Sequence, residues 1–106
     1  MIREREVESY LSKRLKRIGL ACIKFIPDQV NGMPDRMILL PGSRVLWVEL
    51  KTKGGALSEI QKLRHRELRG QGQDVVVVWS KEQVDELVQS LSSTSAGTTS
   101  ATTTAP

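Results

Sequence analysis

The chain has 106 residues, a formal net charge of +4 and a pI of about 9.6, which indicates one domain with a modest core and favours a polyanionic partner. Its single cysteine, Cys22, excludes an intrachain disulfide and suits a reducing cytosol. Apolar runs fall short of the roughly 20 residues that a membrane span needs, and the charged N-terminus lacks a signal-peptide core, so we expect a cytoplasmic protein with no membrane partner.

The first half of the chain predicts a helix followed by strands. A helix is expected over residues 3–18, where apolar side chains recur at helical spacing and Gly19 is placed to end it. Runs of strand-forming residues, separated by proline and glycine turns, then predict strands over residues 20–26, 35–40 and 44–51.

The second half alternates between helix and strand. Ser58 and Gln61 fit a capping box that begins a helix ending near Arg69. The nearly continuous apolar run 74–80 is typical of a strand covered on both faces. A second capping box at Ser80 begins a last helix with an apolar stripe up to residue 91.

The resulting order is αβββαβα, which predicts an α/β fold with a mixed sheet flanked by helices. Residues 1–91 form the expected domain. Residues 92–106, rich in Ser, Thr and Ala, lack charge and large apolar side chains. We expect a disordered tail there, or an extension that orders against a partner.

The stretch "GMPDRMILLPGSRVLWVELK" reads as a hairpin that carries charge near its open end. Side chains alternate across a strand, so Glu49 and Lys51 share one face about 7 Å apart. Counting outward from the turn at Pro41-Gly42 places Asp35 opposite residues 48–50. Two neighbouring carboxylates suit a hard cation such as Mg²⁺, and a nearby ammonium stabilises charge on a phosphate. The alternative is a surface cross-strand salt bridge.

The fuller pattern "GMPD…WVELKTKGG…SEIQKLRHRELRGQGQDVVVVWS" resembles the VRR-NUC domain of the PD-(D/E)XK nuclease superfamily, over about residues 4–91. The resemblance implies a restriction-endonuclease-like αβββαβ core, here with an extra C-terminal helix. It also implies an endonuclease that cuts DNA with Mg²⁺ or Mn²⁺. Free-standing members resemble Holliday junction resolvases, so we expect a homodimer acting on branched or duplex DNA in a bacterial or phage-infected host cell. The alternatives are a nicking or flap nuclease and a non-catalytic DNA-binding module.

The resemblance also implies roles for individual residues. Asp35 and Glu49 would be metal ligands and Lys51 the catalytic lysine, and Gln61 would lie beside the site while also capping its helix. The family uses a further acid from the first helix, for which the sequence offers Glu4, Glu6 and Glu8. Glu4 and Glu8 both continue the buried stripe of that helix, whereas Glu6 lies on its outer face, and we choose Glu8 as a catalytic residue and metal ligand. Its alternative is a salt bridge with a neighbouring base.

Two clusters of basic residues are candidates for binding DNA phosphates. The alternative is that they are solvated helix faces. The residues assigned to DNA contact are Lys13, Lys16, Arg17, Lys53, Lys62 and Arg66. His65, the single histidine, is expected on a helix surface. Trp47 is expected to pack, either under the first helix or at a dimer contact.

Overall fold

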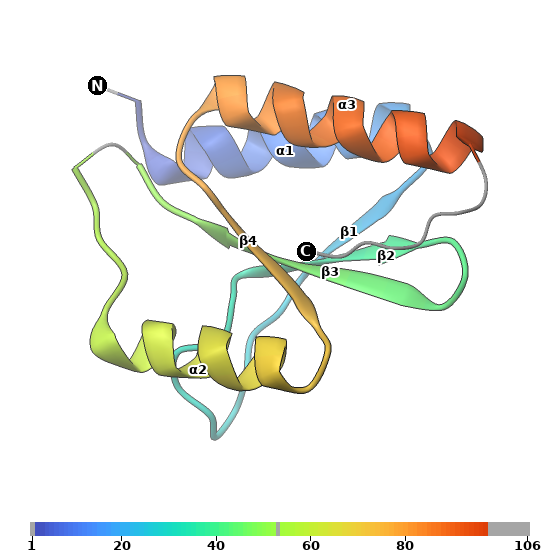
Figure 1. The fold of residues 1–106 in the computed structure, drawn as a ribbon. Helices are drawn as coiled ribbons and strands as arrows, with labels where there is room; N and C mark the ends of the chain where they lie inside the picture. The colour runs from blue at the N-terminus through green and yellow to red at the C-terminus, as the bar shows by residue number, and fades with distance from the viewer. Residues whose placement is uncertain (1, 53, 98–106) are drawn as a thin grey trace.

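A four-stranded mixed sheet with helices on both faces forms the framework (Figure 1). This computed structural model describes residues 2–52 and 54–97. The elements are α1 (Glu4–Arg17), β1 (Ala21–Lys24), β2 (Arg36–Leu40), β3 (Arg44–Leu50), α2 (Glu59–Gly70), β4 (Asp74–Val78) and α3 (Lys81–Gly97). The predicted α/β class and the order αβββαβα are confirmed.

The sheet has the order β1-β2-β3-β4, with β1–β2 and β2–β3 antiparallel and β3–β4 parallel. The parallel pair follows from α2, which carries the chain back to the start of the sheet. Arg36 pairs with Val48 across β2 and β3. Extending that register by one residue places Asp35 opposite Glu49, as the hairpin count predicts.

One face of the sheet carries the apolar core. Alternate residues of β3 point into it, and α1 and α3 lie side by side over it (Figure 1). Each fully buried aliphatic side chain there contributes about 1.5–3 kcal/mol. The buried core residues are Val7, Leu11, Leu15, Ile38, Leu46, Val48, Leu50, Val78, Val84 and Val88. The helical spacing in α1 and the alternation in β3 are therefore confirmed as core patterns.

The opposite face of the sheet is divided. Helix α2 packs on the β4 side of the sheet, whereas half-exposed apolar residues such as Ile23 and Leu39 remain on β1 and β2. The candidate site lies on this face, at the end of β3 covered by α2.

The last helix extends beyond residue 91, where the expected domain ends. Helix α3 continues to Gly97, because Ala favours a helix and Ser and Thr lower helix stability only modestly. Residues 98–106 lie outside the described residues. Within the described part of the chain, no helix combines the length and apolar character that a membrane crossing requires.

Candidate active site

The carboxylate of Asp35 is tied to the end of β3. Its Oδ2 accepts a hydrogen bond from the backbone N–H of Leu50 at 2.9 Å, and its backbone carbonyl accepts one from Phe25 at 2.9 Å. One bond fixes the side chain of Asp35 and the other fixes its backbone. Asp35 is thus positioned by the sheet rather than by a free loop.

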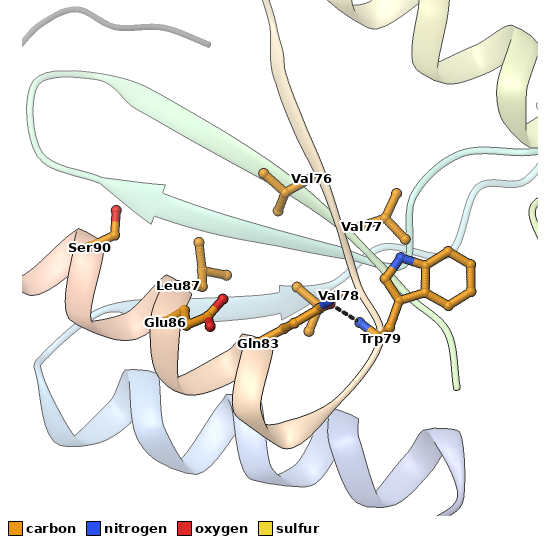
Figure 2. A pocket seen from close by; sticks show the side chains of 8 residues that line it. All are labelled: Val76, Val77, Val78, Trp79, Gln83, Glu86, Leu87 and Ser90. Carbon is orange, nitrogen blue, oxygen red and sulfur yellow. Dashed lines mark hydrogen bonds between the residues drawn. The ribbon is translucent and has the colours of Figure 1, made fainter. Parts of the chain in front are cut away.

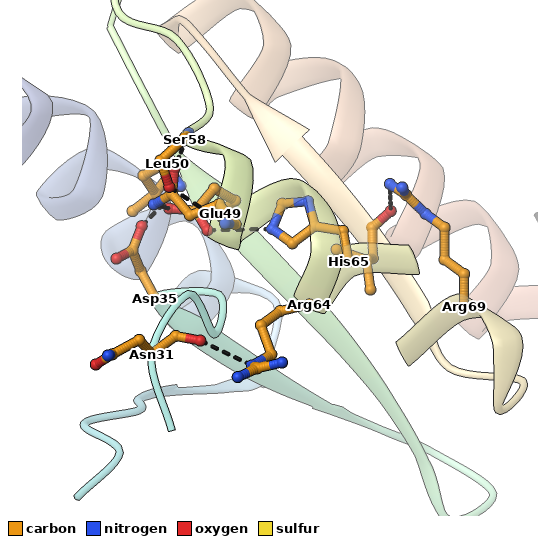
Figure 3. Close-up of polar contacts among 10 residues, drawn as sticks. Asn31, Asp35, Glu49, Leu50, Ser58, Arg64, His65 and Arg69 are labelled. Carbon is orange, nitrogen blue, oxygen red and sulfur yellow. Dashed lines mark hydrogen bonds and ion pairs between the residues drawn. The ribbon is translucent and has the colours of Figure 1, made fainter. Parts of the chain in front are cut away.

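The loop that precedes Asp35 is seated on α2 (Figure 3). Arg64 donates from Nε to the backbone carbonyl of Asn31 at 2.8 Å. Gly32 has a φ of 85° and lies so close to the helix that a Cβ would come within 2.6 Å of the Ile60 carbonyl oxygen. Only glycine accommodates both that backbone angle and that approach. The glycine of "GMPD" therefore serves to dock the loop that carries Asp35.

Glu49 is a buried carboxylate, with 1% of its surface exposed. Its Oε2 accepts a hydrogen bond from Nε2 of Gln61 at 3.3 Å, and its Oε1 lies 3.2 Å from Nε2 of His65. Burial raises the pKa of Glu49 to about 8, and the hydrogen bond to Asp35 and the charge of Asp35 act in the same direction. The charge of Lys51 has a smaller, opposing effect. Glu49 consequently keeps its proton near neutral pH.

Gln61 makes two contacts at once, one in its helix cap and one to Glu49. Its backbone N–H donates to Oγ of Ser58 at 3.2 Å, and its side-chain Oε1 accepts from the Ser58 N–H at 2.9 Å, which completes the predicted capping box. Because the oxygen end of the amide is used by the cap, the nitrogen end is directed to Glu49. The helix cap thus orients a side chain of the site.

His65 is not on the surface, and the expectation that it would be is wrong. Only 1% of the residue is exposed, and its ring meets Glu49 (Figure 3). Burial, and then the charge of Arg69, lower the pKa of His65. Its Nδ1 is buried without a hydrogen-bond partner among the described residues. The signal that would have found it is its spacing of four residues from Gln61, which places both on one helix face.

Lys51 directly follows β3, and its backbone N–H donates to the Val78 carbonyl at 3.0 Å. Its side chain is half-buried. The ammonium charge acts to lower the pKa values of both Glu49 and Glu4. The ammonium of Lys51 therefore acts on two carboxylates at the end of the strand.

The acids of α1 have different partners. Glu8, the choice from the sequence, forms an ion pair with Arg36, with Oε2 at 2.8 Å from Nη2 and 3.1 Å from Nε. Glu6 accepts the Arg3 N–H at 2.8 Å, at the start of the helix. Burial, and then the charge of Asp35, raise the pKa of Glu4, while Lys51 lowers it. Glu4 is thus an α1 acid that interacts electrostatically with both Asp35 and Lys51.

The donor set suits a hard divalent cation that retains water. Among the described residues, no three His, Cys, Asp or Glu side chains come together as a metal-binding group. Asp35 and Glu49 supply two carboxylates, and the charge of a bound cation would favour the ionised form of Glu49 over its protonated form. Mg²⁺ prefers oxygen ligands and commonly binds through one or two carboxylates while keeping several waters. These residues therefore fit Mg²⁺ or Mn²⁺ rather than a structural zinc.

The candidate DNA-binding cations fall into two groups. Lys62 and Arg66 lie on exposed positions of α2, although Lys62 pairs with Glu59 at 3.2 Å. Lys13, Lys16 and Arg17 are exposed on the second half of α1. Lys13 alone lies about 14 Å along the helix from Glu4, at about 1.5 Å per residue. Lys53 lies outside the described residues.

A separate groove of about 410 Å³ lies between β4 and α3 (Figure 2). It is lined by Val76, Val77, Val78, Trp79, Gln83, Glu86, Leu87 and Ser90. Within it, the Trp79 N–H donates to Oε1 of Gln83 at 2.7 Å. No residue assigned to the site lines this groove, and the carboxylate of Glu86 is unfavourable for a phosphate.

Comparisons with known proteins indicate the same type of domain. No family model matches the chain. A relative named "Putative nuclease p44", from Acyrthosiphon pisum secondary endosymbiont phage 1, is 32% identical over 82 residues, covering 77% of this chain and 88% of that protein. A solved structure described as a VRR_NUC domain is similar with a TM-score of 0.75 and 30% sequence identity, covering 81% of this chain and 94% of its own. Similarity thus extends over most of the length of both relatives.

Proposed function

From the premise that this chain belongs to the VRR-NUC family of nucleases, we propose that it is a divalent-metal-dependent endonuclease that hydrolyses phosphodiester bonds in branched DNA. The observation that carries the proposal is the convergence of Asp35 with a buried Glu49, next to the cation of Lys51. A buried acid with a strongly raised pKa beside a second acid is typical of a functional site.

Each residue has a role that follows from its contacts. Asp35 and Glu49 would hold the Mg²⁺ or Mn²⁺ ion, which when bound stabilises charge on the phosphate and lowers the pKa of water. The Leu50 N–H fixes Asp35, and Gln61 fixes Glu49. Lys51 orients the attacking water or stabilises charge on the phosphate.

We assign the role of the α1 acid to Glu4 in place of Glu8. Glu8 is already neutralised by Arg36 at 2.8 Å, whereas the pKa of Glu4 is raised by burial and by Asp35. A further carboxylate near the cation raises the local negative potential and so supports cation binding. Glu8 then serves to fasten α1 to β2.

DNA is held by cations that flank the site. Lys62 and Arg66 on α2 lie on the helix that also carries Gln61, so they are placed to contact phosphates next to the cleaved bond. Lys13, Lys16 and Arg17 lie far enough along α1 to reach a different duplex arm. This separation favours a branched substrate over a single short duplex.

A homodimer is proposed because one domain measures only 36 × 33 × 22 Å, and a two-fold pair would present two sites to two strands. The face of β1 and β2 that α2 leaves uncovered supplies the surface. By alternation from the buried Ile38, it carries Ala21, Ile23, Phe25, Met37, Leu39, Val45 and Trp47.

The character of that face favours a second copy as its occupant. None of these seven side chains carries a charge, so they offer no ion pair to a DNA phosphate. Ile23 is 41% exposed and Leu39 is 42% exposed. Phe25 and Trp47 form an edge-to-face pair with centroids 5.2 Å apart. Exposed apolar patches of this kind mark protein interfaces, and the same patch on two copies is self-complementary by symmetry.

Cleavage of labelled DNA tests the proposed activity. A four-way junction, a flap and a linear duplex of matched sequence are each incubated with Mg²⁺, with Mn²⁺ or with chelator. We expect symmetric junction cleavage that requires the cation. Preferential cutting of the flap or of one strand would indicate a flap or nicking nuclease, and binding without cutting would indicate a non-catalytic module.

Sedimentation velocity tests the dimer with a matched pair of variants. Leu39→Glu places a charge on the proposed surface and should give a monomer that no longer cuts the junction symmetrically. Leu63→Glu changes a leucine of similar exposure, 36%, on α2 and should remain dimeric. A wild-type protein that sediments only as a monomer, or a dimer that tolerates Leu39→Glu, would refute this interface.

A further inference from the structure

His65 and Gln61 contact the same carboxylate, that of Glu49, from one face of α2. They are one helical turn apart, so their side chains emerge side by side. Gln61 donates to Oε2 of Glu49 at 3.3 Å, while Nε2 of His65 lies 3.2 Å from Oε1 (Figure 3). Both oxygens of the carboxylate are therefore contacted from the helix, each by a different residue.

Two contacts are what is needed to fix the plane of a carboxylate. The terminal torsion of a glutamate is broad, unlike the staggered torsions nearer the backbone. One hydrogen bond would leave the group free to rotate about the contacted oxygen. With Oε1 and Oε2 both contacted from α2, Glu49 keeps one orientation beside Asp35, whose hydrogen bond and charge act on it.

The side chains of Gln61 and His65 are themselves held in place. The capping box holds the amide of Gln61 through its oxygen. The imidazole of His65 is 1% exposed and fills space between α2 and the sheet. A rigid partner on each side holds the carboxylate in one orientation before any cation or DNA arrives, which lowers the entropy cost of binding.

We propose that His65 is a positioning residue of this nuclease, which with Gln61 fixes the plane of Glu49, a carboxylate that would hold the divalent cation. The inference rests on the proposed function. Nε2 carries the hydrogen and donates it to Glu49, and Nδ1 is bare. With the hydrogen on Nδ1 instead, a buried N–H would lack an acceptor, because no described residue pairs with that atom.

Substitutions at position 65 separate positioning from space filling. His65→Gln retains an amide N–H that can occupy the place of Nε2, whereas His65→Leu fills a similar volume with no donor. By calorimetry, we expect His65→Leu to weaken Mg²⁺ binding by about 10- to 100-fold, as for other residues that orient a metal ligand. His65→Gln should stay within about 3-fold of wild type on the same grounds.

Kinetics and a matched control complete the test. His65→Leu should lower kcat while the KM for DNA stays unchanged, because no DNA contact is assigned to this residue. Val75→Ala alters another buried side chain, on β4, and should leave Mg²⁺ affinity unchanged even though it lowers thermal stability. Equal Mg²⁺ affinity and kcat in wild type and His65→Leu would overturn the inference, as would a Gln variant as impaired as the Leu variant.

A spectroscopic readout is independent of cleavage. Two-bond ¹H–¹⁵N correlation spectra of the metal-free protein should show His65 as the neutral Nε2–H tautomer. An Nδ1–H tautomer would overturn the inference whatever the activity. Wild-type protein that neither binds Mg²⁺ nor cuts DNA would refute the proposed function and the inference together, whereas a normal wild type with a normal His65→Leu variant would refute the inference alone.

Discussion

The two faces of β3 serve opposite purposes although their residues alternate along one strand. Leu46, Val48 and Leu50 point into the apolar core beneath α1 and α3. Glu49, between two of them, points to the other face and is equally buried, but as an acid with a pKa raised to about 8. On one face, burial of aliphatic side chains stabilises the fold. On the other face, burial makes the ionised form of Glu49 unfavourable without a cation.

The same division extends across the sheet. The apolar core accounts for most of the buried aliphatic residues, so the opposite face is free to carry a polar site under α2 and an uncovered apolar area on β1 and β2. The aliphatic core is therefore built without the side chains that we assign to catalysis. This separation makes the two faces distinguishable by mutation.

The largest effect is expected for Lys51→Ala. Loss of a cation placed to stabilise transition-state charge should lower the cleavage rate by about 1,000-fold, with little change in the melting temperature, because the side chain is outside the core. Leu46→Ala on the other face is the contrasting variant. It should cost about 2–5 kcal/mol of stability while the folded fraction still cuts. Cleavage assays and thermal melts of both variants provide the check.

Gly32→Ala should come next, because it disturbs the loop that carries Asp35. The added Cβ would come within 2.6 Å of the Ile60 carbonyl oxygen, at a φ of 85°, and such strain costs about 1–3 kcal/mol. We expect reduced thermal stability together with reduced cleavage. Gly42→Ala also has a positive φ, but its Cβ would meet nothing within 4 Å. It should lower stability less and spare activity, and equal damage by both variants would contradict the proposed docking role.

A smaller effect distinguishes the two acids of α1. Glu4→Gln removes a charge that interacts with Asp35 and Lys51, and it should weaken Mg²⁺ affinity and cleavage by about 10-fold. Glu8→Gln breaks the ion pair with Arg36 and should lower stability slightly while leaving Mg²⁺ affinity intact. Calorimetric titrations of the two variants would decide the assignment, and the reverse pattern would restore Glu8 as the metal-site acid.

The smallest effect is expected from pH on the metal-free protein. The pKa of Glu49 is about 8 when folded and 4.5 as the reference value, so the folded state binds the extra proton between these values. Its contribution to stability is fully present below about pH 4.5 and is lost as the pH rises through about 8. The melting temperature in chelator should fall as the pH rises across that window. Glu49→Gln should flatten this dependence; an unchanged slope would contradict the pKa assignment.

Much of the fold could be predicted because its signals are local. Alternation in "RVLWVELK", the capping box at Ser58 and glycine breakers determine the elements, and the Pro41-Gly42 turn determines the register that brings Asp35 opposite Glu49. These features depend on neighbours along the chain or directly across a hairpin. Local chemistry is sufficient for them.

Other features depend on how whole elements pack. Whether His65 faces water or the sheet depends on the rotation of α2 about its axis, which the sparse apolar residues of that helix leave open. The choice between Glu4 and Glu8 depends on the position of α1 along the sheet. In the structure, Glu8 forms an ion pair with Arg36. The end of α3 at Gly97 likewise cannot be read from residues that neither favour nor break a helix strongly.

Calorimetric titration of Mg²⁺ into metal-free protein tests most directly whether Asp35 and Glu49 form one cation site. Wild type should bind Mg²⁺ and release protons as it does so, because the cation displaces the proton that Glu49 holds near neutral pH. Asp35→Asn and Glu49→Gln should each abolish the binding while both proteins stay folded. Undiminished Mg²⁺ binding in either variant, or no binding by wild type, would contradict the account.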